Sequence, residues 1–397
     1  MQTNSPILFV EINLNNFIFV ALEVNDNNQF QKVYTNKTSI AGISDNKISD
    51  INQVNDIIKE NIFYLEKKLN FVFKEVVLIT NNFNCFLINL AGFKRLNGSQ
   101  LSKDNVTHIL NSLKSKIIES EDKKRILHIF NTKYFLDKKN VENLPIGLFG
   151  DFYSQELSFF LVDENDYMNL INIFNKCNLK VSKIISKNFL EGISLINKNS
   201  NLETFFKIEI FENESEIFFF ENSALKFSQR FNFGSDSIIR DISKITALNH
   251  QLVKKILSNF DFSKDILESD LIEKNFFDDQ NFRKIKKKLI YDIASARIEE
   301  IAEIIILKNI NLVSFLKKNL TIFLKVNDNT LKCFDKNFKS IFMGNFDFEL
   351  KIIENAFFEE LYSNAHALVQ YGWKKESVPV IHEKKSTISR IFNLFFK

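Results

Sequence analysis

Residues 206–231, FKIEIFENESEIFFFENSALKFSQRF, decide the fold class. The stretch contains three runs rich in β-forming residues, separated by polar turns of two to four residues: 206–211, 216–221 and 224–231. This spacing predicts a three-stranded meander. The first forty residues predict the same arrangement, with strands at Ile7–Ile12, Phe17–Val24 and Phe30–Thr35. The chain therefore contains an internal duplication of a strand-rich block.

Helices and further strands follow each meander. After the first, apolar residues three and four apart predict a helix from Ile51 to Leu69, and a short buried strand follows at Glu75–Thr80. The later expected elements are a helix at Tyr167–Cys177, a strand at Val181–Ser186, a helix at Phe189–Ile196, helices over 235–308, a strand at Ile322–Val326 and a helix at Asn355–Tyr371. Strand–helix–strand order in both halves indicates two α/β lobes.

A segment with its own pattern interrupts the first lobe between residues 83 and 162. Its expected strands are Cys85–Leu90, Arg125–Phe130 and Leu157–Val162, and Ser102 caps a helix between the first two. A turn is expected at Pro145–Gly147. The segment is therefore predicted to be a small inserted α+β subdomain.

Composition excludes several classes of function. The 397 residues include nine glycines, whereas average usage would give roughly 28, which disfavours an enzyme built on Gly-rich phosphate loops. The formal charge of +3 is too balanced to indicate nucleic-acid binding, and the three cysteines and five histidines show no metal-ligand spacing. No apolar run approaches the ~18 residues of a membrane span, and no signal peptide is expected at the N-terminus.

Several motifs resemble the FtsA family of bacterial cell-division proteins. Arg125–His128, Tyr134 and Asp137, followed by Pro145–Gly150, resemble that family's LHxxPxxYxxD…NP[IL]GLxG, although Leu144 replaces its Asn. Shorter likenesses are spread over the whole chain: Gly42-Ile43 with Ile48–Asp50, Asn175 to Val181, Asp241-Ile242, Arg297–Ile301, and Tyr362–Ala365 with Tyr371-Gly372.

The resemblance implies an α/β, actin-like (ribonuclease-H-like) two-lobed fold with an inserted SHS2-type subdomain and a C-terminal amphipathic helix. The expected first-lobe core is 1–82, 163–200 and 355–373, with the inserted subdomain at 83–162. The expected second-lobe core is 201–240 and 320–354, with a helical subdomain at 241–319. A linker (374–385) and a membrane-targeting helix (386–397) complete the expected organisation.

The resemblance also places ATP and Mg²⁺ between the lobes of typical family members, on glycine-containing hairpins. The corresponding segments of this chain, 11–16, 209–216 and 325–328, have no glycine. The degenerate positions are Glu11, Asn13, Asn16, Glu209, Phe211, Glu212, Asn213, Val326 and Asn327. Phe211 is expected to block close approach, and Glu212, Glu214 and Glu216 are expected to repel a triphosphate. We therefore expect a pseudo-ATPase without a bound cofactor or metal.

Three residues at or near these motifs are expected to have no chemical role. Glu11 and Glu209 keep the acid positions, and we expect them to be exposed carboxylates at strand ends. His128 lies in an apolar strand, and we expect a core histidine with satisfied hydrogen bonds. Catalytic motifs of the HExxH, GxSxG and GxxxxGK[ST] types are absent from the sequence.

The tail, STISRIFNLFFK (386–397), predicts a helix that lies in the surface of an anionic membrane. Its expected lipid contacts are Lys384, Lys385, Ile388, Arg390, Ile391, Phe392, Leu394, Phe395, Phe396 and Lys397. The alternative is a C-terminal helix packed on its own protein. The polar linker and the family's membrane-targeting tail at the same place favour the membrane.

A basic run at 283–288 precedes a helix that contains Arg297. The resemblance implies that this subdomain binds the acidic C-terminal peptide of the tubulin-like division protein FtsZ. The expected contacts are Lys287, Arg297, Glu300 and Ile301. The alternatives are that the basic run is a solvated face, and that Arg297 pairs with an acid along its own helix.

Together these features predict a cell-division adaptor that anchors FtsZ filaments to the cytoplasmic face of the inner membrane at the division site. By resemblance it would form polymers and recruit later division proteins, without ATP hydrolysis and without nucleic acid. The alternatives are a pilus-assembly scaffold like PilM, which typically lacks such a tail, and a nucleotide-binding actin-like ATPase or sugar kinase with unusual loops.

Overall fold

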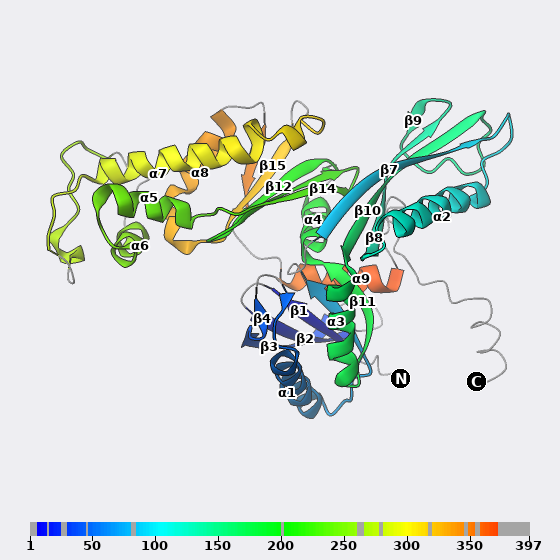
Figure 1. Cartoon of the computed structure of the whole chain (residues 1–397), viewed down its shortest axis with the longest axis horizontal. Coiled ribbons are helices and arrows are strands. Elements are labelled where there is room, and N and C mark those ends of the chain that lie inside the picture. The colour runs from blue at the N-terminus through cyan, green and yellow to red at the C-terminus, as the bar shows by residue number, and fades with distance from the viewer. Residues whose placement is uncertain are drawn as a thin grey trace. The chain divides into compact units, whose positions relative to one another are not determined.

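The computed structural model (Figure 1) describes residues 6–13, 16–24, 30–44, 47–80, 85–199, 202–259, 266–277, 281–316, 320–344, 348–353 and 358–371. The chain divides into two units. Unit 1 contains Met1–Lys198, Asn222–Ala224 and Phe357–Lys397, and unit 2 contains Asn199–Glu221 and Leu225–Ala356. The expected linker and tail, 374–397, lie outside the described residues.

Unit 1 is built on a five-stranded sheet with the order β11-β6-β1-β2-β3. The strands are β1 (Ile7–Ile12), β2 (Asn16–Val24), β3 (Phe30–Ser39), β6 (Glu75–Thr80) and β11 (Lys180–Ser186). β1, β2 and β3 form the expected antiparallel meander, whereas β6 is parallel to both β1 and β11. A two-stranded hairpin, β4 (Ile43–Ser44) with β5 (Lys47–Ile48), was not expected.

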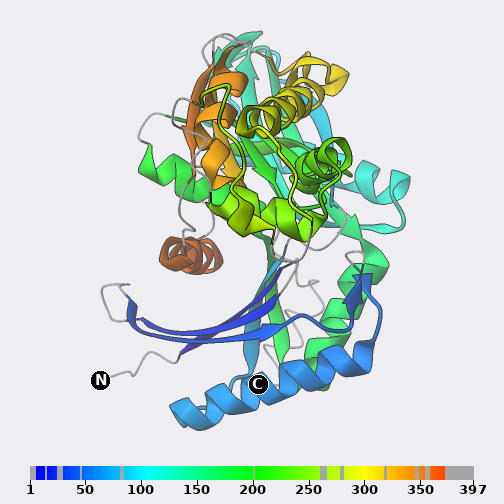
Figure 2. The ribbon, with the colours of Figure 1, turned by 90° about the vertical axis from the view of Figure 1, so that its left-hand side faces the viewer.

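Helices cover both faces of this sheet. Leu8, Val10 and Ile12 of β1 pack in one core with α1 (Ile51–Leu69) and α3 (Glu164–Lys176). Because side chains alternate along a strand, Phe9 and Glu11 contact the opposite layer, α4 (Lys187–Lys198) and α9 (Phe358–Tyr371). Figure 2 shows α1 on one face of the sheet and α9 on the other.

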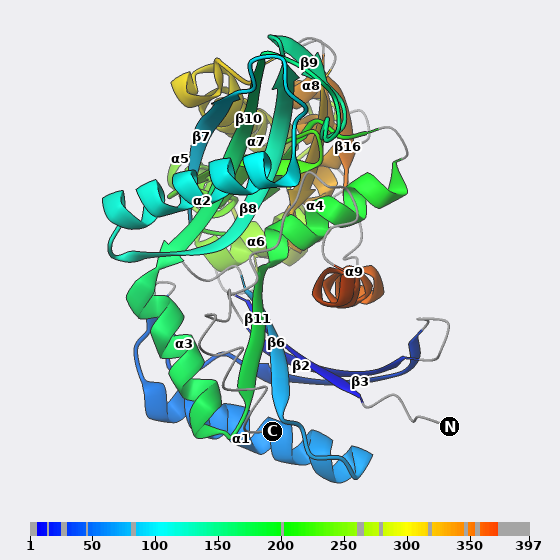
Figure 3. The ribbon, with the colours of Figure 1, turned by 90° about the vertical axis from the view of Figure 1, so that its right-hand side faces the viewer.

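The inserted subdomain has a four-stranded sheet with the order β7-β10-β8-β9. The strands are β7 (Cys85–Arg95), β8 (Lys124–Leu136), β9 (Lys139–Val141) and β10 (Phe152–Asp163). β7, β8 and β10 are longer than expected, and β9 was not expected. α2 (Lys103–Ser120) packs on one face (Figure 3). Gly92 permits this packing, because a Cβ there would lie 2.3 Å from Ile109.

Unit 2 repeats the sheet topology of unit 1. Its order is β14-β13-β12-β15-β16, with β12 (Phe205–Ile210) antiparallel to β13 (Ser215–Glu221) and parallel to β15 (Thr321–Val326). β14 (Ala224–Phe231) and β16 (Glu349–Ile352) are the two edges. The predicted duplication is therefore confirmed, and β12 corresponds to β1.

Helices pack on one face of the unit 2 sheet, over the side chains of Phe206, Ile208 and Ile210. They are α5 (Asp236–Thr246), α6 (His250–Asn259), α7 (Lys287–Ala302) and α8 (Asp335–Gly344). α8 and β16 were not expected. The long helix expected up to residue 308 ends at Ala302 and continues as a π-helical turn over Glu303–Leu307. Among the described residues, no helix combines the length and the apolarity needed to cross a bilayer.

Candidate functional site

Glu11, the acid position of unit 1, is buried at the end of β1 with 2% of its surface exposed. The Lys187 ammonium lies 2.8 Å from Glu11 Oε1, and the Tyr362 hydroxyl donates to Oε2 at 2.8 Å. Burial, followed by the neighbouring Glu11 charge, raises the pKa of Tyr362, so its proton stays on the phenol. The expectation of an exposed carboxylate is wrong, because β1 turns this side chain toward α4 and α9.

Asn13 and Asn16, which follow β1, hydrogen-bond to each other. The Asn13 amide donates to the Asn16 carbonyl oxygen at 3.1 Å, and the Asn16 amide donates to Asn13 Oδ1 at 2.9 Å. Asn13 Nδ2 donates to Glu11 Oε1 at 3.2 Å. The two backbone amides are therefore engaged within the turn instead of facing a phosphate.

Glu209, the acid position of unit 2, occupies the corresponding place at the end of β12 and is 2% exposed. Lys325 from β15 lies 3.1 Å from Glu209 Oε1, and Lys207 lies 3.4 Å from the same oxygen. Lys207 is itself 1% exposed, and its ammonium lies over the Phe218 ring. Here too an exposed carboxylate was predicted, and the carboxylate is buried and paired.

The β12–β13 turn is also closed. The Phe211 amide donates to the Glu214 carbonyl oxygen at 2.8 Å. The Phe211 and Glu212 carbonyl oxygens accept from the amides of Ser235 and Asp236, each at 2.9 Å. Because Ser235 and Asp236 begin α5, the turn itself satisfies amides at a helix N-terminus, where anions commonly bind.

Close contact between this turn and the start of α5 requires glycine at position 234. A Cβ on Gly234 would lie 2.1 Å from the Phe211 carbonyl oxygen and 2.7 Å from the Glu212 carbonyl oxygen. This is one of the nine glycines of the chain. It brings two protein segments together, so it does not expose backbone to a ligand.

The three glutamates expected to repel a triphosphate have cationic partners. Glu216 Oε1 lies 2.7 Å from Arg230, Glu214 lies 3.7 Å from Arg230, and Glu212 lies 2.6 Å from Lys254. These pairs reduce the like-charge repulsion that the sequence predicted. Charge repulsion by these glutamates is therefore weaker than expected. The hydrogen bonds within the turns and the ion pairs of the acids oppose nucleotide binding more than this repulsion does.

The third segment, 325–328, begins with the last two residues of β15 and continues beyond Val326. The Asn327 amide donates to the Ile210 carbonyl oxygen at 2.8 Å, and Asp328 Oδ2 accepts from the Ser235 hydroxyl at 2.7 Å. The ends of β12 and β15 and the start of α5 are thus joined directly. Asn213 lies in the β12–β13 turn as expected and is exposed.

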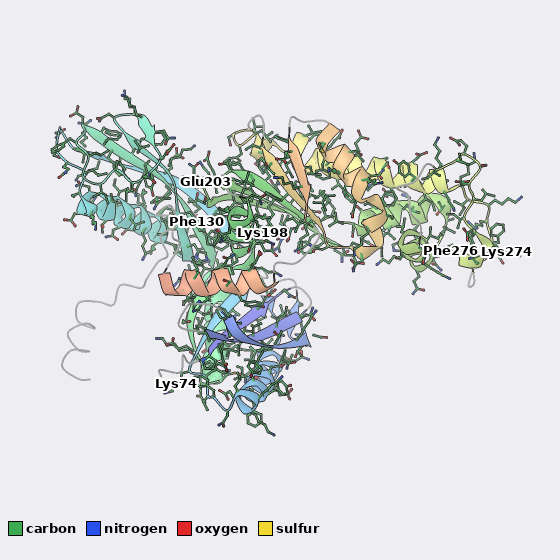
Figure 4. All side chains as sticks on the ribbon, turned by 180° about the vertical axis from the view of Figure 1, so that it is seen from behind. Lys74, Phe130, Lys198, Glu203, Lys274 and Phe276 are labelled. Carbon is green, nitrogen blue, oxygen red and sulfur yellow. The ribbon has the colours of Figure 1, made fainter. Side chains whose placement is uncertain are left out.

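His128 lies on β8 among aromatic rings and is 1% exposed. Its ring centroid is 5.7 Å from each of Phe130, Phe160 and Phe189; Phe130 is labelled in Figure 4. Within the described residues neither ring nitrogen has a hydrogen-bond partner, so the expected satisfied histidine is wrong. Burial, followed by the charge of Lys183, lowers the pKa of His128 to about 3.

The basic run at 283–288, whose last two residues begin α7, is largely paired with acids of unit 2. Lys286 and Lys288 both contact Glu268, and Lys287 lies 3.9 Å from Glu273. Arg283 donates to the Ala247 carbonyl oxygen at 3.4 Å.

The described part of the chain contains no cluster of three or more metal-ligating side chains.

Arg297 joins α7 to α5. Its Nε lies 2.5 Å from Asp241 Oδ2, and its Nη1 lies 2.5 Å from Glu300 Oε2, so the predicted pairing along its own helix is present. Ile301 is 1% exposed and packs in the unit 2 core. The structure therefore corrects the expectation that Ile301 contacts a peptide, since its side chain points inward.

Sequence reasoning missed the partners of the two acid positions: Lys187, Tyr362, Lys207 and Lys325. One of them, Lys207, had a readable signal in the sequence. Lys207 shares a strand face with Glu209 because they are two residues apart, and a lysine in a run as apolar as 205–210 needs a counter-ion. Lys187 and Tyr362 are 176 and 351 positions from Glu11 in the numbering, so only the tertiary structure places them there.

Sequence comparison finds one informative relative, and no family model matches the chain. The cell-division protein FtsA of Buchnera aphidicola subsp. Baizongia pistaciae (strain Bp) is 22% identical over 233 residues, which cover 58% of this chain and 55% of that protein. The chain thus matches about half the length of this curated relative. In sequence the chain is FtsA-like.

Solved structures share the fold at very low identity. The PilM–PilN complex of type IV pilus biogenesis matches with a TM-score of 0.55 and 8% identity, covering 93% of this chain and 99% of that chain. MreB5 of Spiroplasma citri bound to ADP has a TM-score of 0.46 and 11% identity, covering 92% and 96%. The likeness to the PilM–PilN structure confirms the predicted actin-like fold.

Proposed function

We propose that this chain is a cell-division adaptor of the FtsA type that links FtsZ filaments to the cytoplasmic face of the inner membrane without hydrolysing ATP. In this proposal it acts through two adhesive regions, a membrane-binding tail and a peptide-binding subdomain, and it self-associates and recruits later division proteins. The sequence similarity to FtsA and the actin-like fold support the proposal.

One observation favours a scaffold over an enzyme: lysines neutralise both acid positions. Lys187 forms an ion pair with Glu11, and Lys207 and Lys325 both lie within ion-pair distance of Glu209. A divalent ion 4 Å from one ammonium would be repelled by about 8 kcal/mol at a protein-like dielectric constant. Mg²⁺ would therefore have to displace lysines that balance buried charges.

The nucleotide part of the proposal is tested by isothermal titration with Mg-ATP and by phosphate release. We expect no saturable heat up to millimolar nucleotide and no release above the buffer rate. A Kd in the micromolar range would refute this part. A variant with Gly at 211 and 213 would show whether opening the β12–β13 turn alone is enough to admit nucleotide.

The membrane part is tested with vesicles that contain phosphatidylglycerol. Phe392→Glu/Phe395→Glu should release the full chain from these vesicles, because it places two charges on the apolar face of the expected tail helix. Phe149→Glu is a matched control, since Phe149 is 71% exposed in the inserted subdomain. Equal co-sedimentation of the tail variant and the parent would contradict the proposal.

The partner part is tested with the acidic C-terminal peptide of FtsZ. Lys287, Arg297 and Glu300 are partly exposed in unit 2, and each is in an ion pair. An acidic peptide would bind here by competing with the acids that pair Lys287 and Arg297. Arg297→Glu should weaken binding at least about tenfold by reversing a charge. Unchanged affinity in this variant would remove FtsZ as the partner of this surface.

A PilM-like pilus scaffold is the second candidate, because the structural match to the PilM–PilN complex extends over 93% of this chain and 99% of the matched chain. The same titration separates the two functions. Saturable binding of a PilN-type peptide, with no binding of the FtsZ peptide, would favour the pilus scaffold.

A further inference from the structure

β7 of the inserted subdomain is the longest edge strand of the described sheets. It has 11 residues, and each of them, from Cys85 to Arg95, pairs in turn with β10. In the described part of the chain no other strand pairs with β7, which ends the order β7-β10-β8-β9 and forms one border of the sheet in Figure 3. Alternate residues of such a strand direct their backbone amide and carbonyl groups away from the sheet, where a further strand can pair with them.

The other edge strands have features that hinder pairing with a further strand. β9 and β16 contain only three and four residues, and β3 contains two lysines within its ten. The register of β11 with β6 is interrupted by a shift. Gln229 of β14 accepts hydrogen bonds from the side chains of Asn309 and Asn311. β7 has no proline, no acidic residue and no shift in its register with β10, and its first basic residue is Lys94. Such an edge is typical of a strand that pairs with another strand.

The exposed ring of Phe93 lies beside this edge. Phe93 is 67% exposed and stacks on Phe152 of β10, at 5.6 Å between ring centroids. Because side chains alternate along a strand, Phe93 lies on the sheet face opposite Gly92 and α2, as does Leu87. Leu87 and Phe93 are each three positions from Leu90, the middle residue of β7. With this spacing, the strand matches its own reversed copy.

We propose that β7 pairs antiparallel with β7 of a second copy of this chain, about a twofold axis between the two copies of Leu90. This alignment places Leu87 of each copy opposite Phe93 of the other. Lys94 and Arg95, the two basic residues of the strand, then lie at opposite ends of the pair, roughly 30 Å from their counterparts. A parallel pair would instead put each charge beside its own copy, which is destabilising. This inference rests on the self-association in the proposed function and names its interface.

A second copy fits this edge better than an unrelated peptide does. By symmetry, the alignment at Leu90 supplies two contacts between Leu87 and Phe93, and it buries no acidic side chain because β7 has none. An unrelated strand would need an apolar residue opposite Phe93 and acidic residues beside the basic end of β7. The experiments below separate the two occupants.

Association is measured with the full chain by sedimentation velocity, from about 1 to about 100 μM. We expect a reversible dimer that Ala91→Lys/Phe93→Lys weakens at least about tenfold, because it adds charge at the paired edge and removes a ring contact. Both residues are exposed, so the core of the subdomain is kept. Asn140→Lys/Leu148→Lys is the matched control. It adds the same charge at exposed positions outside β7 and should associate as the parent does.

Disulfide formation tests the register directly, in a background with the three native cysteines replaced by serine. Asn89→Cys/Ala91→Cys should give a covalent dimer on oxidation, because the alignment at Leu90 puts position 89 of one copy opposite position 91 of the other. Asn89→Cys alone and Ala91→Cys alone should not, since in each case the two cysteines are diagonal neighbours, beyond disulfide reach. Equal dimer formation by the single variants would overturn the proposed register.

The outcomes distinguish this proposal from the proposed function. If the parent and the edge variant associate equally, another surface mediates self-association and the β7 proposal fails. If the parent stays monomeric and the double cysteine variant does not cross-link, the self-association part of the proposed function fails as well, while the vesicle and FtsZ-peptide titrations decide the rest. Binding of an unrelated strand at β7 would leave the chain monomeric and count against the proposal. Loss of association in the control variant would show a non-specific effect of charge, and would also count against it.

Discussion

Lys187 Nζ lies 2.8 Å from Glu11 Oε1, and the Glu11 side chain is 3% exposed while that of Lys187 is 23% exposed. A lysine at the start of α4 thus forms an ion pair with the acid at the end of β1. Unit 2 repeats the relationship with different elements, since Lys325 of β15 pairs with Glu209 of β12. In both units the lysine neutralises a buried carboxylate, so the pair contributes to the stability of the fold.

Lys187→Met is expected to lower the free energy of unfolding by about 2–4 kcal/mol, because it leaves the Glu11 carboxylate buried without its cation. Adding Glu11→Gln should restore part of the loss. The measurement is urea unfolding followed by circular dichroism. Lys180→Met is the control: its pair with Glu75 is 77% and 59% exposed and should contribute less than about 1 kcal/mol. Equal effects of both substitutions would contradict the assigned burial.

His128 is expected to make the protein sensitive to acid. The pKa of His128 is about 3 in the folded chain and about 6.5 in an unfolded one. Below about pH 6.5 the unfolded chain binds a proton on His128, whereas the folded chain does not until about pH 3. The free energy of unfolding is therefore highest above pH 6.5 and falls between pH 6.5 and 3, with a slope of up to about 1.4 kcal/mol per pH unit.

His128→Phe should remove this slope and should be neutral or stabilising at pH 7, since the ring nitrogens have no hydrogen-bond partner among the described residues. Urea midpoints measured from pH 4 to 8 check it. His108→Gln, at an exposed position of α2, is the control and should keep the slope of the parent. If His128→Phe shows the same dependence of the urea midpoint on pH as the parent, groups other than His128 dominate acid unfolding.

Gly234→Ala is expected to destabilise unit 2 by about 1–3 kcal/mol, because the added Cβ would overlap the Phe211 carbonyl oxygen at 2.1 Å. The nearby exposed Asn232→Ala should have little effect. Thermal unfolding of both variants gives the comparison. Equal melting temperatures would mean that the β12–β13 turn moves away from α5 at little cost.

Arg297 combines a structural position with a proposed binding role, and Asp241 separates the two. Asp241→Asn removes the α5–α7 ion pair and should lower stability by up to about 1 kcal/mol, while leaving the affinity for the FtsZ peptide within about twofold of the parent. Arg297→Glu should lower both quantities. If the two substitutions lower the affinity for the FtsZ peptide equally, Arg297 acts only by positioning α5 and α7.

The duplicated meander could be predicted from the sequence because polar turns and β-forming runs alternate within short stretches. The same local rules located α1 and its cap, Asp50, which accepts from the amides of Asn52 and Gln53. The same rules could have located α8 and β16, which we did not expect, because Phe338, Ile341 and Phe342 have helical spacing and Phe348, Leu350 and Ile352 alternate with polar residues. The rules failed at the end of α7, where a π-helical turn replaces a regular helix over Glu303–Leu307.

The sequence by itself determined that the three nucleotide segments have no glycine, because a missing residue type is visible without coordinates. Only the tertiary structure decided which groups contact the two acids at these segments. Strand alternation turned Glu11 and Glu209 inward, and elements distant in the sequence supplied Lys187, Tyr362 and Lys325 as partners. Burial makes an unpaired charge too costly, so the partners of these acids are set by which elements the fold brings beside them.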